Sequence, residues 1–373
     1  MVNPIRSRLV VISTVIVAGA LLVYVLENIA PIFIDRSQFT FAAAGDYGAN
    51  ENTTATLLGM AGSSSEFVLA LGDFKYDDLP TEDSWCNYVK DKIGLLPFEL
   101  ITGNHDSDGP DMNGHIDNFR LCLPNRIKGI VGDYGKEYYF DYPRPLSLSR
   151  SLPLARIILI SPNIMINGNS YPYNKNSPHY TWLSNAIDGA RDAGIRWIIV
   201  GMHNNCISIG TKDCVTSSEL FNLLLDKKVD LVLHGHDHSY QRSKQLVLNP
   251  ETCPIIWPGY FDSDCIVSDG GHDVYQKGLG TVDVIAGVGG KEPDEVNGSH
   301  KMAPLFVTWM GQNSNPTTGF VKITVSKTKL ISQFIPNNKG GFTDMFMIDG
   351  TATPLPTPTE PYRKKSGREF ISD

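Results

Sequence analysis

The sequence predicts an α/β fold, and two observations indicate it. Before Gln241, apolar runs rich in β-branched and aromatic residues alternate with stretches of helical periodicity. From Gln241 onward the patterned segments are mostly strand-like. Alternation of this kind is typical of βαβ units with largely parallel strands. The change of pattern after Gln241 indicates a second sheet.

The expected elements follow from these patterns in chain order. Strands before Gln241 are predicted at Phe39–Ala44, Phe67–Leu71, Phe98–Thr102, Arg156–Ile160, Trp197–Gly201 and Val229–Leu233. Helices between them are predicted at Asn50–Ala61, Thr81–Ile93, Pro178–Ala193 and Ser217–Lys227. Later strands are predicted at Ser243–Leu248, Thr281–Ala286, Phe320–Val325 and Lys329–Ile335.

Composition and charge limit the kind of partner that we expect. The chain has 373 residues, of which 42% are hydrophobic and 19% charged, which is ordinary globular composition with ample length for a large core. Its net charge of −8 and the lack of a Lys/Arg stripe argue against a nucleic-acid partner, because binding a phosphate backbone needs a basic surface. We expect no obligatory protein partner either.

The N-terminal segment has the pattern of a signal anchor. Arg6 and Arg8 precede an apolar run from Leu9 to Leu26, and a second apolar stub covers Ile29–Ile34. The run approaches the roughly 20 residues that span a membrane and is long for a cleaved signal peptide. We therefore expect residues 1–8 in the cytoplasm, a transmembrane segment over 9–34 and a catalytic domain over 35–350 outside the membrane. Cleavage of the segment would instead give a secreted protein, and a buried core helix is a weaker alternative.

The C-terminal segment and the cysteines also concern the exported part of the chain. Residues 351–373 are rich in Pro and Thr and end in charges, which predicts a disordered tail. The even cysteine count without a CxxC pair predicts three disulfides, although six cysteines allow fifteen connectivities. Short separations favour the local pairs Cys206/Cys214 and Cys253/Cys265.

Residues of the types that bind metals follow five of the predicted strands. The segments are Gly45–Gly48, Gly72–Tyr76, Gly103–Asp106, Gly201–His203 and His234–His238. Open α/β sheets bind ligands beyond the carboxyl ends of their strands, so these segments are expected to converge on one crevice. One Gly-Asp pair or one histidine would be weak evidence, but five such blocks in the same context indicate a metal site.

These blocks resemble those of the calcineurin-like metallophosphoesterases. Tyr76, three residues after Asp73, resembles the purple acid phosphatase branch. Flanking similarity extends to His179–Leu183, Ser239–Arg242 and the glycine turn Gly287–Gly290, so the resemblance covers Phe39 to Gly290. It implies a four-layer αββα sandwich of two mixed sheets, with the site at the mouth between the strand ends.

The resemblance also implies a division of the metal ligands. It places Asp46, Tyr76 and His238 on a first metal, Asn104, His203 and His236 on a second, and Asp73 between them as a bridge. Carboxylates and a phenolate suit Fe³⁺, whereas imidazoles and an amide oxygen suit a divalent ion such as Fe²⁺, Zn²⁺ or Mn²⁺. A purely divalent pair stays open.

Two neighbours of Asn104 are candidates for proton transfer. His105 is expected to protonate the leaving alcohol and, with Asn104, to contact the phosphate. Asp106 either orients the His105 imidazole or simply caps the turn.

The segment after His203 departs from the best-known animal purple phosphatases, which carry a further phosphate-binding histidine there. Asn205, Lys212 or His115 are substitutes to test, and each is otherwise an ordinary loop residue. Trp257, Tyr260 and Phe261, in the Cys253–Cys265 segment, either rim the pocket or serve in packing.

The expected function is hydrolysis of small phosphomonoesters by two metal ions, as in an acid phosphatase. If the protein is an enzyme, the alternative activity is phosphodiester or nucleotide hydrolysis at the same site. If it is not an enzyme, the alternative is a non-catalytic, metal-stabilised surface binding protein. The sequence contains no GxxxxGK[ST], GxGxxG, GxSxG or HExxH motif.

Overall fold

The computed structural model describes residues 37–144 and 152–351. The expected cytoplasmic N-terminus, the transmembrane segment and the Pro/Thr-rich tail lie outside these ranges. Within them, no helix combines the length and the apolar character that crossing a membrane requires. The anchor therefore stays a prediction.

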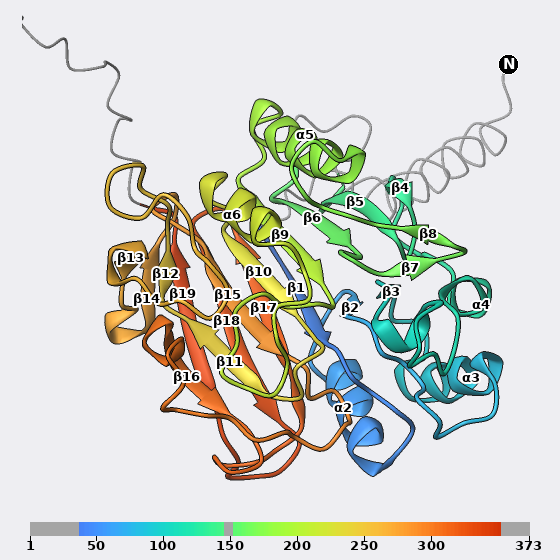
Figure 1. The fold of residues 1–373 in the computed structure, drawn as a ribbon. Coiled ribbons are helices and arrows are strands. Elements are labelled where there is room, and N and C mark those ends of the chain that lie inside the picture. Colours follow the sequence, from blue (N-terminus) through green and yellow to red (C-terminus); the bar gives the residue numbers. More distant parts are fainter. Residues whose placement is uncertain (1–36, 145–151, 352–373) are drawn as a thin grey trace, which may run out of the picture.

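Two large mixed sheets form the centre of the molecule (Figure 1). The first has the strand order β14-β19-β18-β17-β1-β2-β3. Its strands are β1 (Gln38–Ala44), β2 (Val68–Ala70), β3 (Phe98–Leu100), β14 (Val274–Gln276), β17 (Gly319–Ser326), β18 (Lys329–Pro336) and β19 (Asp344–Asp349). β1, β2 and β3 run parallel to one another. On its other side, β1 pairs with β17 in antiparallel orientation.

The second sheet has the order β16-β11-β15-β10-β9-β6-β5-β4. Its strands are β4 (Val131–Asp133), β5 (Glu137–Tyr142), β6 (Ala155–Ile160), β9 (Trp197–Met202), β10 (Leu231–His234), β11 (Tyr240–Ser243), β15 (Val282–Ala286) and β16 (Phe306–Met310). β6, β9, β10 and β15 are parallel neighbours. Two short ribbons pair β7 (Met165–Ile166) with β8 (Asn169–Ser170) and β12 (Gln245–Leu246) with β13 (Ile266–Ser268).

The late strands do not form the second sheet by themselves, which corrects the interpretation of the sequence. β17, β18 and β19 extend the sheet of β1, whereas β11, β15 and β16 extend the sheet of β10. The alternating pattern indicates that strands are present. Which sheet a late strand joins depends on contacts between residues far apart in the chain, such as Phe41 opposite Ile323. Local periodicity does not contain this information.

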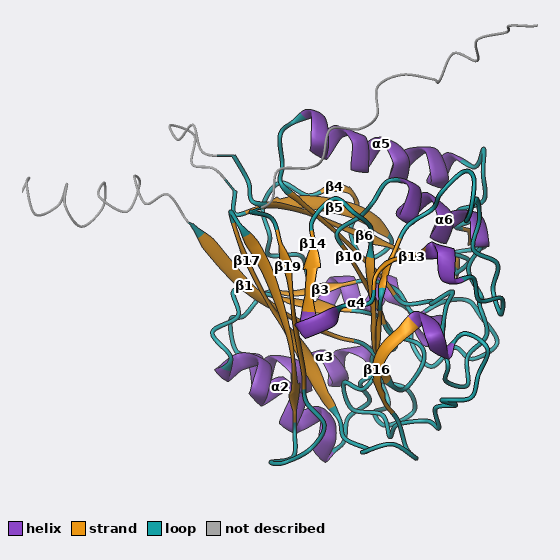
Figure 2. Cartoon of the chain, turned by 90° about the vertical axis from the view of Figure 1, so that its left-hand side faces the viewer, coloured by secondary structure: helices purple, strands orange, loops and turns teal. Residues whose placement is uncertain are grey.

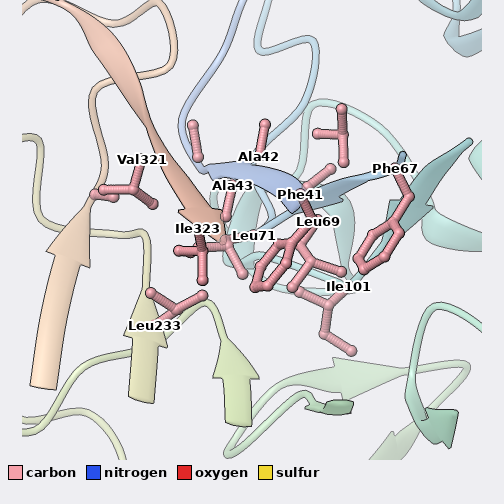
Figure 3. Packing of buried hydrophobic residues seen from close by; sticks show 14 of the residues in the cluster. Phe41, Ala42, Ala43, Phe67, Leu69, Leu71, Ile101, Leu233, Val321 and Ile323 are labelled. Atoms are coloured by element: carbon pink, nitrogen blue, oxygen red, sulfur yellow. The ribbon is translucent and has the colours of Figure 1, made fainter. Parts of the chain in front are cut away.

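The core lies between the two sheets and under the outer helices. In β6, Ile157 and Leu159 join the large cluster between the sheets, while Ile158 and Ile160 join the cluster under α5 (Pro178–Asp192) and α6 (Ser218–Asp226). This division follows the two-residue period of a strand. Figure 3 shows residues of the large cluster from both sheets, including Phe41, Ile323 and Leu233.

The other helices lie on the far side of the molecule from α5 and α6 (Figure 2). α2 (Glu51–Gly62) packs against β17, and α3 (Glu82–Ile93) and α4 (Ile116–Cys122) lie side by side next to it. The four predicted helices all exist, and each begins after a side chain that accepts a hydrogen bond from the first turn, which fixes its start. These caps are Asn50, Thr81, Ser177 and Ser217.

Three disulfides close the described part of the chain. Cys206–Cys214 and Cys253–Cys265 are the expected local pairs, and Cys86–Cys122 joins α3 to α4. No free cysteine remains among the described residues. The predicted disulfide count and the local pairs are confirmed.

Candidate metal centre

The turns that follow the parallel strands of both sheets meet at one end of the molecule. Within the first sheet, the backbone nitrogen of Asp46 donates to the carbonyl of Gly72, at 3.1 Å. Within the second, Gly235 donates to the carbonyl of His203, at 3.2 Å. The two sheets touch here, because a Cβ on Gly45 would lie 2.9 Å from the Cα of Gly235.

This close approach explains why glycines precede the candidate ligands. Gly72 has a φ of +85°, and a Cβ there would lie 2.6 Å from Nδ1 of His203 and 2.7 Å from the backbone of Gly103. A Cβ on Gly235 would lie 2.7 Å from the carbonyl oxygen of Leu71. Real Cβ atoms do not tolerate such contacts, so larger residues at these positions would push the turns apart.

Several candidate ligands adopt a left-handed backbone conformation that L-residues rarely take. The φ values are 63° for Asp46, 56° for Asp73, 47° for Tyr76 and 69° for His236. Such residues cost about 1–3 kcal/mol each and persist where the surrounding structure holds them, which is often at functional sites. These four residues lie on turns that carry the candidate ligands, although left-handed residues such as Asn163 and Lys228 occur elsewhere too.

One group of polar atoms converges around the phenol of Tyr76. Its oxygen lies 3.0 Å from Oδ1 of Asp46, 3.2 Å from Oδ2 of Asp73 and 3.2 Å from Nε2 of His238. Nε2 of His238 is also 3.3 Å from Oδ1 of Asp46. These are the residues expected on the first metal, together with the expected bridge.

A second group converges around Nε2 of His203. This nitrogen lies 3.2 Å from Oδ2 of Asp73 and 3.0 Å from Oδ1 of Asn104. Asp73, His203 and His236 each offer a ligand atom, and these atoms all lie within 4.8 Å of one another. The described residues thus contain a group able to hold a metal ion, and Oδ2 of Asp73 contacts both groups.

Proton affinities in this cluster are strongly perturbed. Burial favours the neutral form of Asp73, but the neighbouring His203 and His105 outweigh burial and hold the pKa of Asp73 well below its usual range. Burial lowers the pKa of His203, but Asp73 outweighs it and raises that pKa to about 9. Burial and the charge of His203 lower the pKa of His236 to about 3. Burial and the charges of Asp46 and Asp73 raise the pKa of Tyr76 well above its usual value.

These shifts fit a cation site. The raised pKa of His203 favours a positive charge next to the buried carboxylates, whereas the raised pKa of Tyr76 keeps its phenol neutral. Bound cations would supply the positive charge instead and favour release of both protons. The donor atoms are carboxylate, phenol and amide oxygens with imidazole nitrogens, a set that suits iron, zinc or manganese.

Asp106 binds backbone rather than the His105 ring. Its carboxylate accepts hydrogen bonds from the backbone nitrogens of Asp73 at 2.6 Å, Phe74 at 3.0 Å and Gly103 at 3.1 Å. Burial, followed by the charge of Asp73, raises its pKa to about 7. The turn-capping interpretation thus describes its contacts, and among the described residues Asp106 is not the partner of the His105 imidazole.

His105 is held by other contacts. Its backbone nitrogen donates to Oδ1 of Asp73 at 2.9 Å, and its Nδ1 is hydrogen-bonded to Oδ1 of Asn113. Its ring packs against that of Tyr76, with centroids 4.5 Å apart, and its Nε2 is 3.9 Å from Oδ2 of Asp73. Sequence reasoning missed Asn113, because it lies in an irregular loop eight positions after His105.

The three candidates for additional substrate contacts are placed differently. Asn205 is fully buried, its Nδ2 donates to the carbonyl of Ile207 at 3.4 Å, and its Oδ1 has no hydrogen-bond partner among the described residues. The positive charge of Lys212 lies close enough to His236 to lower its pKa further. His115 instead caps α4 and contacts Asp108 at 3.0 Å.

The aromatic residues of the Cys253–Cys265 segment divide between solvent and packing. Trp257 and Tyr260 are 55% and 61% exposed, whereas Phe261 packs against the cluster that contains both cysteines.

The turn Gly287–Gly290 and its neighbours also border the site. The backbone nitrogen of Gly289 donates to the carbonyl of Gly45 at 2.8 Å, and that of Lys291 donates to the carbonyl of Asp46 at 3.0 Å. Nζ of Lys291 lies 4.4 Å from the ring centroid of Tyr76. The glycine run identified this turn in the sequence, but nothing local marked Lys291.

Comparison with known proteins agrees with this geometry. The family model described as calcineurin-like phosphoesterase matches residues 39–240. Among curated proteins, the chain is 28% identical over 223 residues to a phosphoenolpyruvate phosphatase of Allium cepa, covering 56% of this chain and 43% of the relative. It is 26% identical over 227 residues to an Fe(3+)-Zn(2+) purple acid phosphatase of Arabidopsis thaliana, covering 56% and 44%.

Solved structures show the same fold. A purple acid phosphatase of yellow lupin, Lupinus luteus, aligns with a TM-score of 0.59 at 16% identity, covering 84% of this chain and 54% of that one. GAP50, the anchor in the inner membrane complex of Plasmodium, aligns with a TM-score of 0.53 at 18% identity, covering 84% and 90%. The expected resemblance to purple acid phosphatases is confirmed.

The chain spans less than half the length of the curated relatives it matches, 43% and 44% of the two named above. The family match nevertheless covers more than half of this chain and includes the strand ends from β1 to β10. The chain therefore belongs to the calcineurin-like phosphoesterase family.

Proposed function

We propose that this protein hydrolyses small phosphomonoesters at a dinuclear metal centre, as an acid phosphatase of the purple type. The observation that supports it best is the position of Asp73, whose Oδ2 lies 3.2 Å from the Tyr76 oxygen and 3.2 Å from Nε2 of His203. A carboxylate between two converging sets of donors is what a bridging ligand requires.

The ligand sets support different metals on the two sides. Asp46, Tyr76 and His238 would hold the first ion, and the two anionic oxygens favour Fe³⁺. Asn104, His203 and His236 would hold the second, a divalent ion such as Fe²⁺, Zn²⁺ or Mn²⁺. When bound, such a pair polarises the phosphoester and lowers the pKa of water. The similarity to an Fe(3+)-Zn(2+) purple acid phosphatase supports this choice of metals.

The remaining residues of the centre position the substrate and move a proton. Nδ1 of His105 is bonded to the Asn113 oxygen, so the imidazolium form would give its Nε2 proton to the leaving alcohol oxygen and leave a neutral ring. Asn104 and His105 would contact the phosphate, with Asn205 as a further candidate. Asp106 would hold the turns that carry Asp73 and Asn104 rather than touch the substrate.

An exported, membrane-anchored enzyme is the proposed setting. Three disulfides support an oxidising compartment, and the apolar run Leu9–Leu26 after Arg6 and Arg8 supports a signal anchor. Protease added to intact cells should digest the catalytic domain and leave a small anchored fragment. If the domain is protected from protease until the cells are lysed, the proposed orientation is wrong.

Asp73→Asn tests the dinuclear site. The amide lacks the charge needed between two cations, so we expect fewer than two metals per chain in elemental analysis and almost no hydrolysis of nitrophenyl phosphate. Asp283→Asn offers a control, since Asp283 is equally buried but pairs with His234 at 2.7 Å. Normal turnover with two metals in Asp73→Asn would eliminate the dinuclear mechanism. An inactive wild type with two metals bound would instead favour the non-catalytic alternative.

A further inference from the structure

Lys291 is a cation at the candidate centre that has no carboxylate partner among the described residues. Its Nζ lies 4.4 Å from the centroid of the Tyr76 ring, and it takes part in none of the ion pairs formed among the described residues. The neighbouring acids have other partners. Glu292 accepts from Asn52 at 2.9 Å, and Asp294 accepts from Thr211 at 2.9 Å.

The backbone of Lys291 fixes where this charge lies. Its nitrogen donates to the carbonyl of Asp46 at 3.0 Å, directly after the turn that docks on Gly45. The stem of the side chain therefore starts beside one candidate ligand, Asp46, and its ammonium group ends over the ring of another, Tyr76. A lysine ammonium has three rotatable donors on a flexible stem, so it can turn from an aromatic face to an anion without backbone movement.

The two possible substrate classes differ in what such a cation can bind. Above the second phosphate pKa of about 6, a phosphomonoester carries two negative charges, whereas a diester carries one. The monoester also has one more terminal oxygen able to accept a hydrogen bond. Since charge-assisted hydrogen bonds are the strong ones, an unpaired ammonium beside the metal ligands favours the monoester.

We propose that Lys291 is a specificity-determining residue that selects phosphomonoesters over phosphodiesters by binding the additional terminal oxygen of the monoester. This inference rests on the proposed function, because it assumes that phosphoesters are hydrolysed at the centre held by Asp73.

The test compares Lys291→Met with wild type at a pH above 6, on nitrophenyl phosphate and bis-nitrophenyl phosphate. Loss of the charge should lower kcat/KM for the monoester roughly tenfold, mainly through KM, because the contact exists in the bound ground state. The diester should change little. The dissociation constant for inorganic phosphate, measured by calorimetry, should rise by a similar factor while metal content stays at the wild-type level.

Two further variants distinguish the effect of the Lys291 charge from an effect of the substitution on folding. Lys291→Arg keeps the charge and should retain most of the monoester preference, whereas Lys291→Gln should lose it as Lys291→Met does. Lys92→Met is the matched control, because Lys92 also stacks on a tyrosine, 5.2 Å from the Tyr88 ring, but lies in α3. If Lys291→Met fails to fold, the Gln variant decides.

The outcomes distinguish this inference from the proposed function. An unchanged ratio of monoester to diester activity in the Met or Gln variant, with wild-type activity that depends on Asp73, would overturn the role of Lys291 alone. Equal losses on both esters would also overturn it, since they would mean a general effect on the centre. Wild-type protein that hydrolyses neither ester would refute the proposed function itself.

Discussion

The Asp106 carboxylate joins two turns of the first sheet, since it accepts hydrogen bonds from the backbone nitrogen of Asp73 at 2.6 Å and from that of Gly103 at 3.1 Å. Both turns present candidate ligands, Asp73 itself on one and Asn104 on the other. A buried side chain bonded to backbone nitrogens thereby links two parts of the site.

Asp106→Ala should therefore act on metal binding as well as stability. It leaves buried backbone donors without acceptors, at about 1–3 kcal/mol each, so we expect a lower midpoint of thermal unfolding and fewer metals per chain. Asp106→Asn keeps one acceptor oxygen and should be milder on both counts. Asp349→Ala is a suitable control, because the Asp349 side chain also accepts a backbone hydrogen bond, from Thr351, but lies near the surface. Full metal content in Asp106→Ala would show that the turns hold their spacing without it.

The His105–Asn113 contact predicts a graded loss of proton transfer. His105→Ala should keep its metals and lower turnover on poor leaving groups by roughly 10²–10⁴-fold, the range typical of a lost general acid. Turnover of nitrophenyl phosphate should fall less, because its leaving group scarcely needs a proton.

Asn113→Ala should lower turnover in the same pattern but to a smaller extent, since the imidazole remains while its orientation is lost. The surface residue Asn249 provides a control as Asn249→Ala. Equal losses on good and poor leaving groups would mean that His105 only orients the phosphate, and loss of metal would make it a ligand.

Glu99 predicts a pH dependence of stability away from the metal centre. It is fully buried in β3, its Oε1 accepts from the backbone of Arg126 at 3.0 Å, and its Oε2 has no hydrogen-bond partner among the described residues. Burial raises its pKa from 4.5 to about 7. Between these values the folded state binds more protons than the unfolded state, so the free energy of unfolding falls as pH rises, by about 3 kcal/mol in all.

Glu99→Gln removes this titration, and its unfolding free energy should depend less steeply on pH between 4.5 and 7 than that of wild type. Chemical denaturation at several pH values measures the difference. Glu295→Gln, an exposed change, should leave the wild-type slope intact. A slope in Glu99→Gln as steep as in wild type would assign the pH dependence to other groups.

Tyr76→Phe tests the choice of metal. A phenolate on Fe³⁺ should give wild-type protein a violet or pink charge-transfer colour, which the Phe variant should lose while both metals stay on the other ligands. Packing against His105 is preserved in the variant because the ring remains. Iron with unchanged colour in the variant would exclude Tyr76 as the coloured ligand. Tyr47, the other tyrosine of these segments, would not replace it, because its buried hydroxyl donates to the carbonyl of Ala44 at 2.9 Å. A colourless wild type that contains only divalent ions would place the protein outside the purple phosphatases.

The sequence predicted the parts of the fold that depend on local pattern. The four helices, the inner strands and two local disulfides follow from residues close together in the chain. The distribution of the late strands between the two sheets could not be predicted from local pattern, because it depends on pairs of residues far apart in the chain, such as Phe41 opposite Ile323.

The same division applies to the candidate site. Asp46, Asp73, Asn104 and His203 were recognisable because each comes one or two positions after a glycine at the end of an apolar strand. Asn113 and Lys291 were not, since each reaches the centre from a turn or loop without any metal-ligand pattern. The role of Asp106 needed the structure, because a carboxylate near a histidine in sequence orients it only if their side chains meet.

The contact between Gly45 and Gly235 puts the candidate centre on the seam between the two sheets. Ligands on both sides of a seam make a bound ion a cross-link that the unfolded chain does not contain, so metal binding and sheet docking become one equilibrium. Amide hydrogen exchange would reveal this directly. Amides of the two glycine turns should exchange more slowly when metal is bound. At the opposite ends of the strands, metal should change the exchange rate only of amides that exchange through global unfolding.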